Sequence, residues 1–112
     1  RQMCIETARA PRAAIDCNRS PEDVDPLLIE GLSGPVRPSA RARSGLGIIP
    51  GRTAAHGALW RGPIARVELD RRLREAHAPF HDALAAKLTR LVAEQGSAIL
   101  IDVIQCPIGA AR

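Results

Sequence analysis

The sequence predicts an α/β fold, and three observations support that prediction. A short apolar run, Ala13–Ile15, gives way to polar residues from Asp16 onward. A second apolar run covers residues 97–102 and ends in an acidic residue. Between the two runs, apolar residues recur at steps of three and four, which is typical of an amphipathic helix. A strand, a long connection, a helix and a second strand make a crossover unit of an α/β protein.

The first predicted strand covers residues 12–16, and a turn follows it. Residues 20–63 hold six of the nine prolines, so we expect a long irregular connection there. Inside it, residues 37–43 form a basic segment, and residues 45–50 form an apolar piece that we expect as a short edge strand.

The helical pattern is the clearest signal in the sequence. Pro79 interrupts it, so the sequence predicts either a kink or two helices, over residues 66–77 and 79–95. Gly96 is well placed to end the second helix. We expect the apolar stripe to pack on a sheet in which the two predicted strands are neighbours or near neighbours. The stripe consists of Leu69, Leu73, Ala76, Phe80, Leu84, Leu88 and Leu91.

The amino-acid composition limits the classes of protein to which this sequence can belong. The 112 residues amount to one small domain or a piece of a larger one, and 46% of them are apolar. The net charge is +4, and 15 of the 16 basic residues are arginine, which suits anionic partners. Cys4, Cys17 and Cys106 show no CxxC spacing, which argues against a disulfide framework or a structural zinc site and favours the cytoplasm. No apolar run approaches the ~20 residues of a membrane span, and no secretory leader pattern is present.

Polar residues follow both predicted strands, which places Asp16 and Asp102 at one edge of the sheet if the strands are parallel. Ligands of open α/β sheets bind at that carboxyl edge. Asn18 and Arg19 offer an amide beside a guanidinium fork, a combination that suits a small carboxylate ligand. The alternative is structural, with Arg19 paired to Asp16 and Asn18 capping a turn. The residues alone favour this alternative.

The histidine pair His77 and His81, and the single Cys17, each have a functional and a structural interpretation. His77 and His81 are four residues apart, a spacing that can bind a metal from one helix face, but Pro79 between them disturbs that geometry. Histidines on a helix surface are more common than metal ligands, and we expect the same here. Cys17 has no neighbouring histidine in the sequence, so we expect a buried, inert thiol rather than a nucleophile.

Five short motifs in the same order resemble the N-formylglutamate amidohydrolase family. Residues 11–19 (PRAAIDCNR) are similar to its SR-x-x-IDxNR signature. Residues 45–50 (GLGIIP), 56–61 (HGALWR) and 78–81 (APFH) follow in family order. Residues 100–102 (LID) are similar to the strand before its DxHS motif, so the resemblance covers nearly all of residues 9 to 102.

The resemblance implies a partial zinc-carboxypeptidase-like mixed sheet flanked by helices. It also implies a zinc amidohydrolase that cleaves an N-acyl amino acid, such as N-formyl-L-glutamate, to formate and L-glutamate. By the same resemblance, Asn18 and Arg19 would bind a substrate carboxylate, and Arg12 would stabilise the oxyanion near the scissile carbonyl. His81 has a counterpart in the family without a role that we can assign.

The sequence departs from the family pattern at the zinc ligands. A catalytic zinc takes about three protein ligands. The family's first two, a His and a Glu, would precede residue 1, and the third would stand two residues after Asp102, where the sequence has Ile104. A family acid/base Glu would lie beyond residue 112. We therefore expect residues 1–112 to be a fragment of a single amidohydrolase domain that alone binds no zinc and is inactive.

The tail after Asp102 suggests why the third ligand is missing. Codons for residues 103–107 (VIQCP) can be chosen so that a shifted reading frame gives Cys-His-Ser-Met-Pro, a family-like motif. We interpret residues 103–112 as an out-of-frame tail created by a single-base deletion. Coincidence and genuine divergence are the alternatives.

A second function class is a small Arg-rich module that binds anions or nucleic acid. Its phosphate contacts would come from Arg37, Arg41, Arg43 and Arg52. Trp60 and Phe80 are the only aromatic residues, so no stacking pattern accompanies these arginines. The sequence therefore favours a small acyl-amino-acid substrate over nucleic acid or a membrane as partner.

Overall fold

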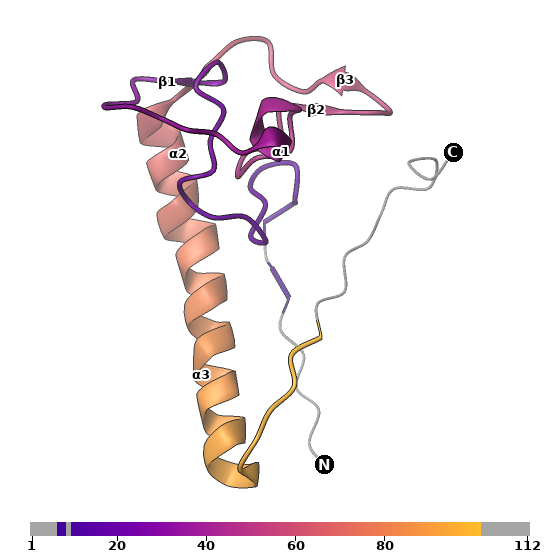
Figure 1. Ribbon diagram of the computed structural model, residues 1–112, viewed down its shortest axis with the longest axis vertical. Coiled ribbons are helices and arrows are strands. Elements are labelled where there is room, and N and C mark those ends of the chain that lie inside the picture. Colours follow the sequence, from indigo (N-terminus) through magenta and orange to yellow (C-terminus); the bar gives the residue numbers. More distant parts are fainter. Residues whose placement is uncertain (1–6, 9, 102–112) are drawn as a thin grey trace.

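The computed structural model describes residues 7–8 and 10–101. A long helical segment over residues 66–95 dominates it (Figure 1), as the sequence predicts. Its parts are α2 (Arg66–Arg72), the π-helical turn η1 (Leu73–His77) and α3 (Ala78–Gln95).

The two predicted helices are therefore joined through a wide turn rather than separated. The Ala78 N–H donates to the Leu73 carbonyl, five residues back, immediately before Pro79. Because proline cannot donate a backbone hydrogen bond, a change of turn type at this point accommodates it. Gly96, with a φ of 81°, ends α3 in the left-handed conformation that glycine adopts readily, which confirms the predicted helix end.

The elements before the helix are all short. They are β1 (Ile29–Glu30), α1 (Ala40–Arg43), β2 (Arg52–Thr53), β3 (Gly57–Ala58) and β4 (Ile64–Ala65). β1 pairs with β4 in parallel, and β2 pairs with β3 in antiparallel orientation, so the fold is mixed α/β with two small sheets. In register, Ile29 lies opposite Ile64. Figure 1 shows these elements gathered around α2, while α3 extends beyond them.

Three strand predictions are wrong. Residues 12–14 form a turn. In the segment that follows, the Asp16 N–H donates a hydrogen bond to the Ile48 carbonyl at 2.8 Å, but no strand forms. Residues 45–50 bend instead of forming an edge strand. Residues 97–101 have no regular structure, and Asp102 lies outside the described residues. A short apolar run can be buried without a strand partner, and this is what happens to Ile15 and Ile48.

The core lies between the N-terminal loops and α2. It contains Ile15, Cys17, Val24, Ile29, Ile48, Ile49, Ile64 and Leu69. The predicted apolar stripe contributes Leu69, which is 3% exposed, and Leu73 and Phe80 pack partly against the same core. Leu84 and Leu88 lie outside that cluster and stay partly exposed, so the prediction that the whole stripe packs on a sheet is wrong for most of α3.

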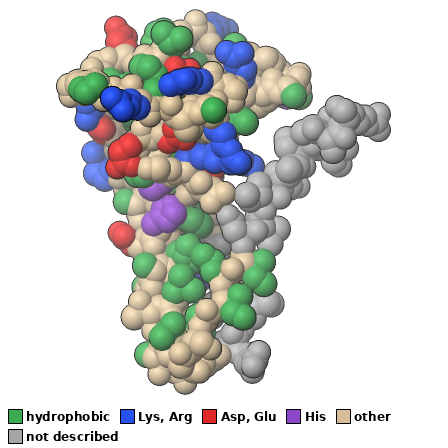
Figure 2. Space-filling view, in the orientation of Figure 1, with side chains coloured by type: hydrophobic (Ala, Val, Ile, Leu, Met, Phe, Trp, Pro, Cys, Tyr) green, Lys and Arg blue, Asp and Glu red, His purple; other side chains and the backbone are tan. Residues whose placement is uncertain are grey.

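The kinds of side chain on the surface also differ between the two ends of the long helix (Figure 2). Acidic and basic side chains gather over the α2 end, whereas hydrophobic side chains are more frequent along the α3 end. Ile99 and Ile101, just after the helix, are 84% and 77% exposed. Among the described residues, no helix is both long and apolar enough to cross a membrane.

Candidate functional site

Asp16 is the centre of the predicted site. It is 5% exposed, and its Oδ2 accepts a hydrogen bond of 3.1 Å from Arg12 Nε. Its Oδ1 accepts one of 3.0 Å from the Asn18 backbone N–H. Arg19 Nε lies 3.8 Å from the same Oδ2 as an ion pair. The structure thus brings Arg12, Asn18 and Arg19 together around one buried carboxylate.

The two arginines differ in how well their donors are satisfied. The Arg12 side chain is 48% exposed and Nε has its hydrogen bond, whereas the Arg19 side chain is only 17% exposed. Arg19 Nε is buried and has no hydrogen-bond partner within the described part of the chain. A buried charged donor without a partner is unfavourable, and a ligand can reach only the part of the Arg19 side chain that remains accessible.

The geometry of this segment matches the structural interpretation from the sequence. The ion pair between Arg19 and Asp16 is present, and Asn18 takes part in the turn through its backbone N–H. A separation of 3.8 Å is too long for a hydrogen bond, however. Asp16 therefore holds the Arg19 guanidinium electrostatically rather than by a hydrogen bond.

The helix holds this loop from the opposite side. Arg72 Nη1 donates to the Ala14 carbonyl at 2.8 Å. His77 Nε2 lies 2.9 Å from the Arg19 carbonyl, and His81 Nε2 lies 2.6 Å from the Cys17 carbonyl. Sequence reasoning missed these contacts. The four-residue spacing of the histidines was the available signal, and it does not identify the group that they contact.

Arg72 is itself held by a network on α2. Its guanidinium lies 5.1 Å from the centre of the Trp60 ring, and its Nε donates to Glu68 at 2.9 Å. Hydrogen bonds from Arg71 and Arg72 lower the pKa of Glu68 to about 2. Trp60 donates to the Pro50 carbonyl at 2.8 Å. Glu68 and Trp60 thus orient the arginine that contacts the loop.

Cys17 is buried, as the sequence predicts. Burial, and secondarily the charge of Asp16, raise the pKa of its thiol. A thiol with a raised pKa holds little thiolate at neutral pH, and thiolate is the nucleophilic form. The structure therefore favours a packing role for Cys17.

The donor set that a zinc ion needs is not assembled in the described residues. No group of three or more His, Cys, Asp or Glu side chains in residues 7–8 and 10–101 is placed to hold a metal ion. His77 and His81 direct Nε2 to backbone carbonyls. These residues do not fit the zinc that the family resemblance implies. Asp102 and Ile104 lie outside the described residues.

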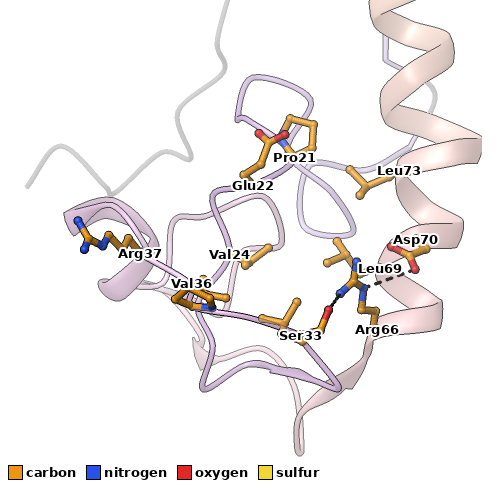
Figure 3. A pocket seen from close by; sticks show the side chains of 12 residues that line it. Pro21, Glu22, Val24, Ser33, Val36, Arg37, Arg66, Leu69, Asp70 and Leu73 are labelled. Carbon is orange, nitrogen blue, oxygen red and sulfur yellow. Dashed lines mark hydrogen bonds and ion pairs between the residues drawn. The ribbon is translucent and has the colours of Figure 1, made fainter.

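A pocket of about 330 Å³ lies elsewhere, between α2 and the loop over residues 21–37 (Figure 3). Arg66 bridges one side of it, donating to Ser33 at 3.2 Å and pairing with Asp70 at 3.7 Å. Neither Arg12, Asn18 nor Arg19 lines this pocket. The predicted site and the pocket are separate features.

Comparison with known families places the chain among the amidohydrolases. A family model described as N-formylglutamate amidohydrolase matches residues 2–106. The chain therefore belongs to the N-formylglutamate amidohydrolase family, which confirms the resemblance found in the sequence.

One solved structure is similar to the chain. It is the crystal structure of N-formylglutamate amidohydrolase from Ralstonia eutropha JMP134, with 31% sequence identity and a TM-score of 0.67. The match covers 77% of this chain and 31% of that one, so the chain spans about a third of the length of that protein. A search of curated proteins finds no match.

Proposed function

We propose that this chain carries the carboxylate-binding part of an enzyme that hydrolyses a linear amide, with an N-acyl amino acid such as N-formyl-L-glutamate as substrate. Water would cleave the formyl amide to give formate and L-glutamate. Membership of the amidohydrolase family supports the reaction class. The observation that carries the substrate assignment is the grouping of Arg12, Asn18 and Arg19 around the buried Asp16 carboxylate.

In this proposal Arg19 and Asn18 bind a substrate carboxylate. The guanidinium offers paired N–H donors that match the two carboxylate oxygens, and the amide of Asn18 adds a neutral donor. Asp16 keeps Arg19 in place through the 3.8 Å ion pair. Because Asp16 itself is negative and nearly fully buried, it also limits the cost of holding the guanidinium away from water.

Arg12 is assigned to the scissile carbonyl. Its Nε is fixed on the same Asp16 oxygen, while half of its side chain remains exposed to a ligand. A guanidinium beside the carbonyl would stabilise the negative charge that develops on oxygen as water adds. In this proposal Arg19 binds the substrate carboxylate, and Arg12 stabilises the charge that develops on the carbonyl oxygen.

The family resemblance also implies a zinc ion, which would polarise the carbonyl and activate water. The His, Cys, Asp and Glu side chains of the described residues do not fit such a site. We propose that the 112-residue chain alone holds no zinc at a family-type site and does not hydrolyse N-formyl-L-glutamate. Metal analysis after dialysis tests this directly. One tightly bound zinc per chain, or turnover that a chelator abolishes, would contradict it.

The binding part of the proposal is tested by titration. N-formyl-L-glutamate should bind the chain, with chemical-shift changes centred on Arg19 and Asn18. The matched control ligand is the same molecule with both carboxylates converted to amides, which should bind at least about tenfold more weakly because it loses the charge-assisted pairing. Equal affinity for the two ligands would refute the assignment of these residues to a carboxylate.

A further inference from the structure

Two histidines of the long helix contact the backbone on either side of Asn18. The Nε2 atoms of His77 and His81 lie 2.9 Å and 2.6 Å from the carbonyl oxygens of Arg19 and Cys17. Both contacts join residues about 60 positions apart in the sequence. They fix the loop to the helix at the two residues that flank Asn18.

The acceptors show that one particular nitrogen of each ring carries a hydrogen. A carbonyl oxygen only accepts hydrogen bonds, so Nε2 of each histidine must carry the hydrogen. The rings also restrain each other, because the ring centres of His77 and His81 are 4.5 Å apart and those of Phe80 and His81 are 5.2 Å apart in a T-shaped arrangement. Each N–H is therefore directed at its carbonyl by packing as well as by the hydrogen bond.

The π-helical turn η1 explains how both histidines reach the loop. In a regular α-helix, three steps of four residues from Leu69 to His81 would rotate the side chain by about 120° away from the starting face. The wider turn over residues 73–77 absorbs part of this rotation. The face that buries Leu69 in the core is thus continued by His77, which is buried, while the exposed His81 still reaches the Cys17 carbonyl.

On its other side the same loop is fixed by Asp16. The Arg19 N–H donates to the Asp16 carbonyl at 3.1 Å, and the Asn18 N–H donates to its carboxylate at 3.0 Å. We propose that His77 and His81 are positioning residues, which hold the Cys17–Arg19 backbone so that Asn18 and Arg19 face a substrate carboxylate together. This role rests on the proposed function, since it presupposes that these two residues bind the carboxylate.

The test compares three variants of the 112-residue chain. His81→Leu removes the donor, and His81→Gln keeps an N–H donor at a position similar to Nε2. His56→Leu is the matched control, because His56 is an exposed histidine of the β2–β3 connection. We expect His81→Leu to speed amide exchange of Asn18 and Arg19 and to weaken N-formyl-L-glutamate binding, each by about tenfold. His81→Gln should keep the amide exchange rates and the affinity within about threefold of those of the parent chain. His56→Leu should leave both quantities unchanged.

Each outcome decides between the two proposals. If the parent chain does not bind N-formyl-L-glutamate, the proposed function fails. If the parent binds it and His81→Leu binds equally well, or if His81→Gln loses as much affinity as His81→Leu, only the positioning role fails. Nitrogen NMR of the unsubstituted chain gives a check that needs no variant to fold. Both rings should show the Nε2–H tautomer, and an Nδ1–H tautomer at either would overturn the inference.

Discussion

At the α2 end of the long helix, Leu69 is 3% exposed and belongs to the core, whereas no described side chain of α3 is buried. Both ends carry leucines at the same helical spacing. The α2 end packs against the loops that hold Ile15 and Ile48, and these loops also place Asp16 and Arg19. Helical periodicity therefore determines which face of the helix is apolar, and the rest of the fold determines where that face is covered.

The largest effect is expected on the free energy of unfolding, for which two leucines of the apolar stripe should differ. Leu69→Ala should lower the free energy of unfolding by about 2–5 kcal/mol, because it opens a cavity in the core. Leu88→Ala, in the partly exposed half, should cost less than about 1.5 kcal/mol. Urea unfolding of the two variants provides the measurement. Equal losses would mean that the α3 face is as well packed as the α2 end.

The next effect concerns the contact between helix and loop. Arg72→Leu removes the hydrogen bond to the Ala14 carbonyl and the stacking on Trp60, and should destabilise the chain by about 1.5–3 kcal/mol. Arg74→Leu, an exposed arginine two residues on, is the matched control and should change stability by less than about 0.5 kcal/mol. Thermal unfolding distinguishes them. A control as damaging as Arg72→Leu would show that the contact with the loop is not the cause.

A smaller, pH-dependent effect is expected at Glu68. Its pKa is about 2 in the folded chain, below its ordinary 4.5, because Arg71 and Arg72 donate hydrogen bonds to it. A lowered pKa stabilises the fold above pH 4.5, and this contribution is lost as the pH falls toward 2. Glu68→Gln should therefore be less stable than the parent chain at pH 7 and equally stable near pH 2.

The control for this pH effect is Thr89→Ala, which changes an exposed, uncharged side chain of α3. Its difference from the parent chain should be the same at both pH values. If the Glu68→Gln difference is also the same at pH 7 and pH 2, the hydrogen bonds to Glu68 do not contribute to stability as described.

Much of this architecture could be predicted from the sequence, but not the strands. The helix over residues 66–95 and its end at Gly96 follow from local periodicity and from glycine's freedom at positive φ. The strands expected at residues 12–16 and 97–102 depended on pairing partners, and the pairs that form join Ile29 to Ile64 and Arg52 to Ala58 instead. Such short strands carry no alternation in the sequence, so only the folded chain shows them.

The candidate site could be predicted as a set of residues but not as an arrangement. Arg12, Asn18 and Arg19 are recognisable from a signature, and they lie around Asp16 because they are close in the sequence. His77 and His81 come from 58 or more residues away. Their spacing indicated a shared helix face, while the carbonyls that they contact depend on how the loop folds.

Binding of a carboxylate by Arg19 can be measured by titrating N-formyl-L-glutamate into Arg19→Ala, Arg19→Lys and a matched control. The control is Arg61→Ala, which removes an exposed arginine. Arg19→Ala should weaken binding by about 10- to 100-fold, and Arg19→Lys should recover only part of the loss because it keeps the charge without the paired donors. Arg61→Ala should bind as the parent chain does. If Arg19→Ala binds N-formyl-L-glutamate as tightly as Arg61→Ala, the account of the site is wrong.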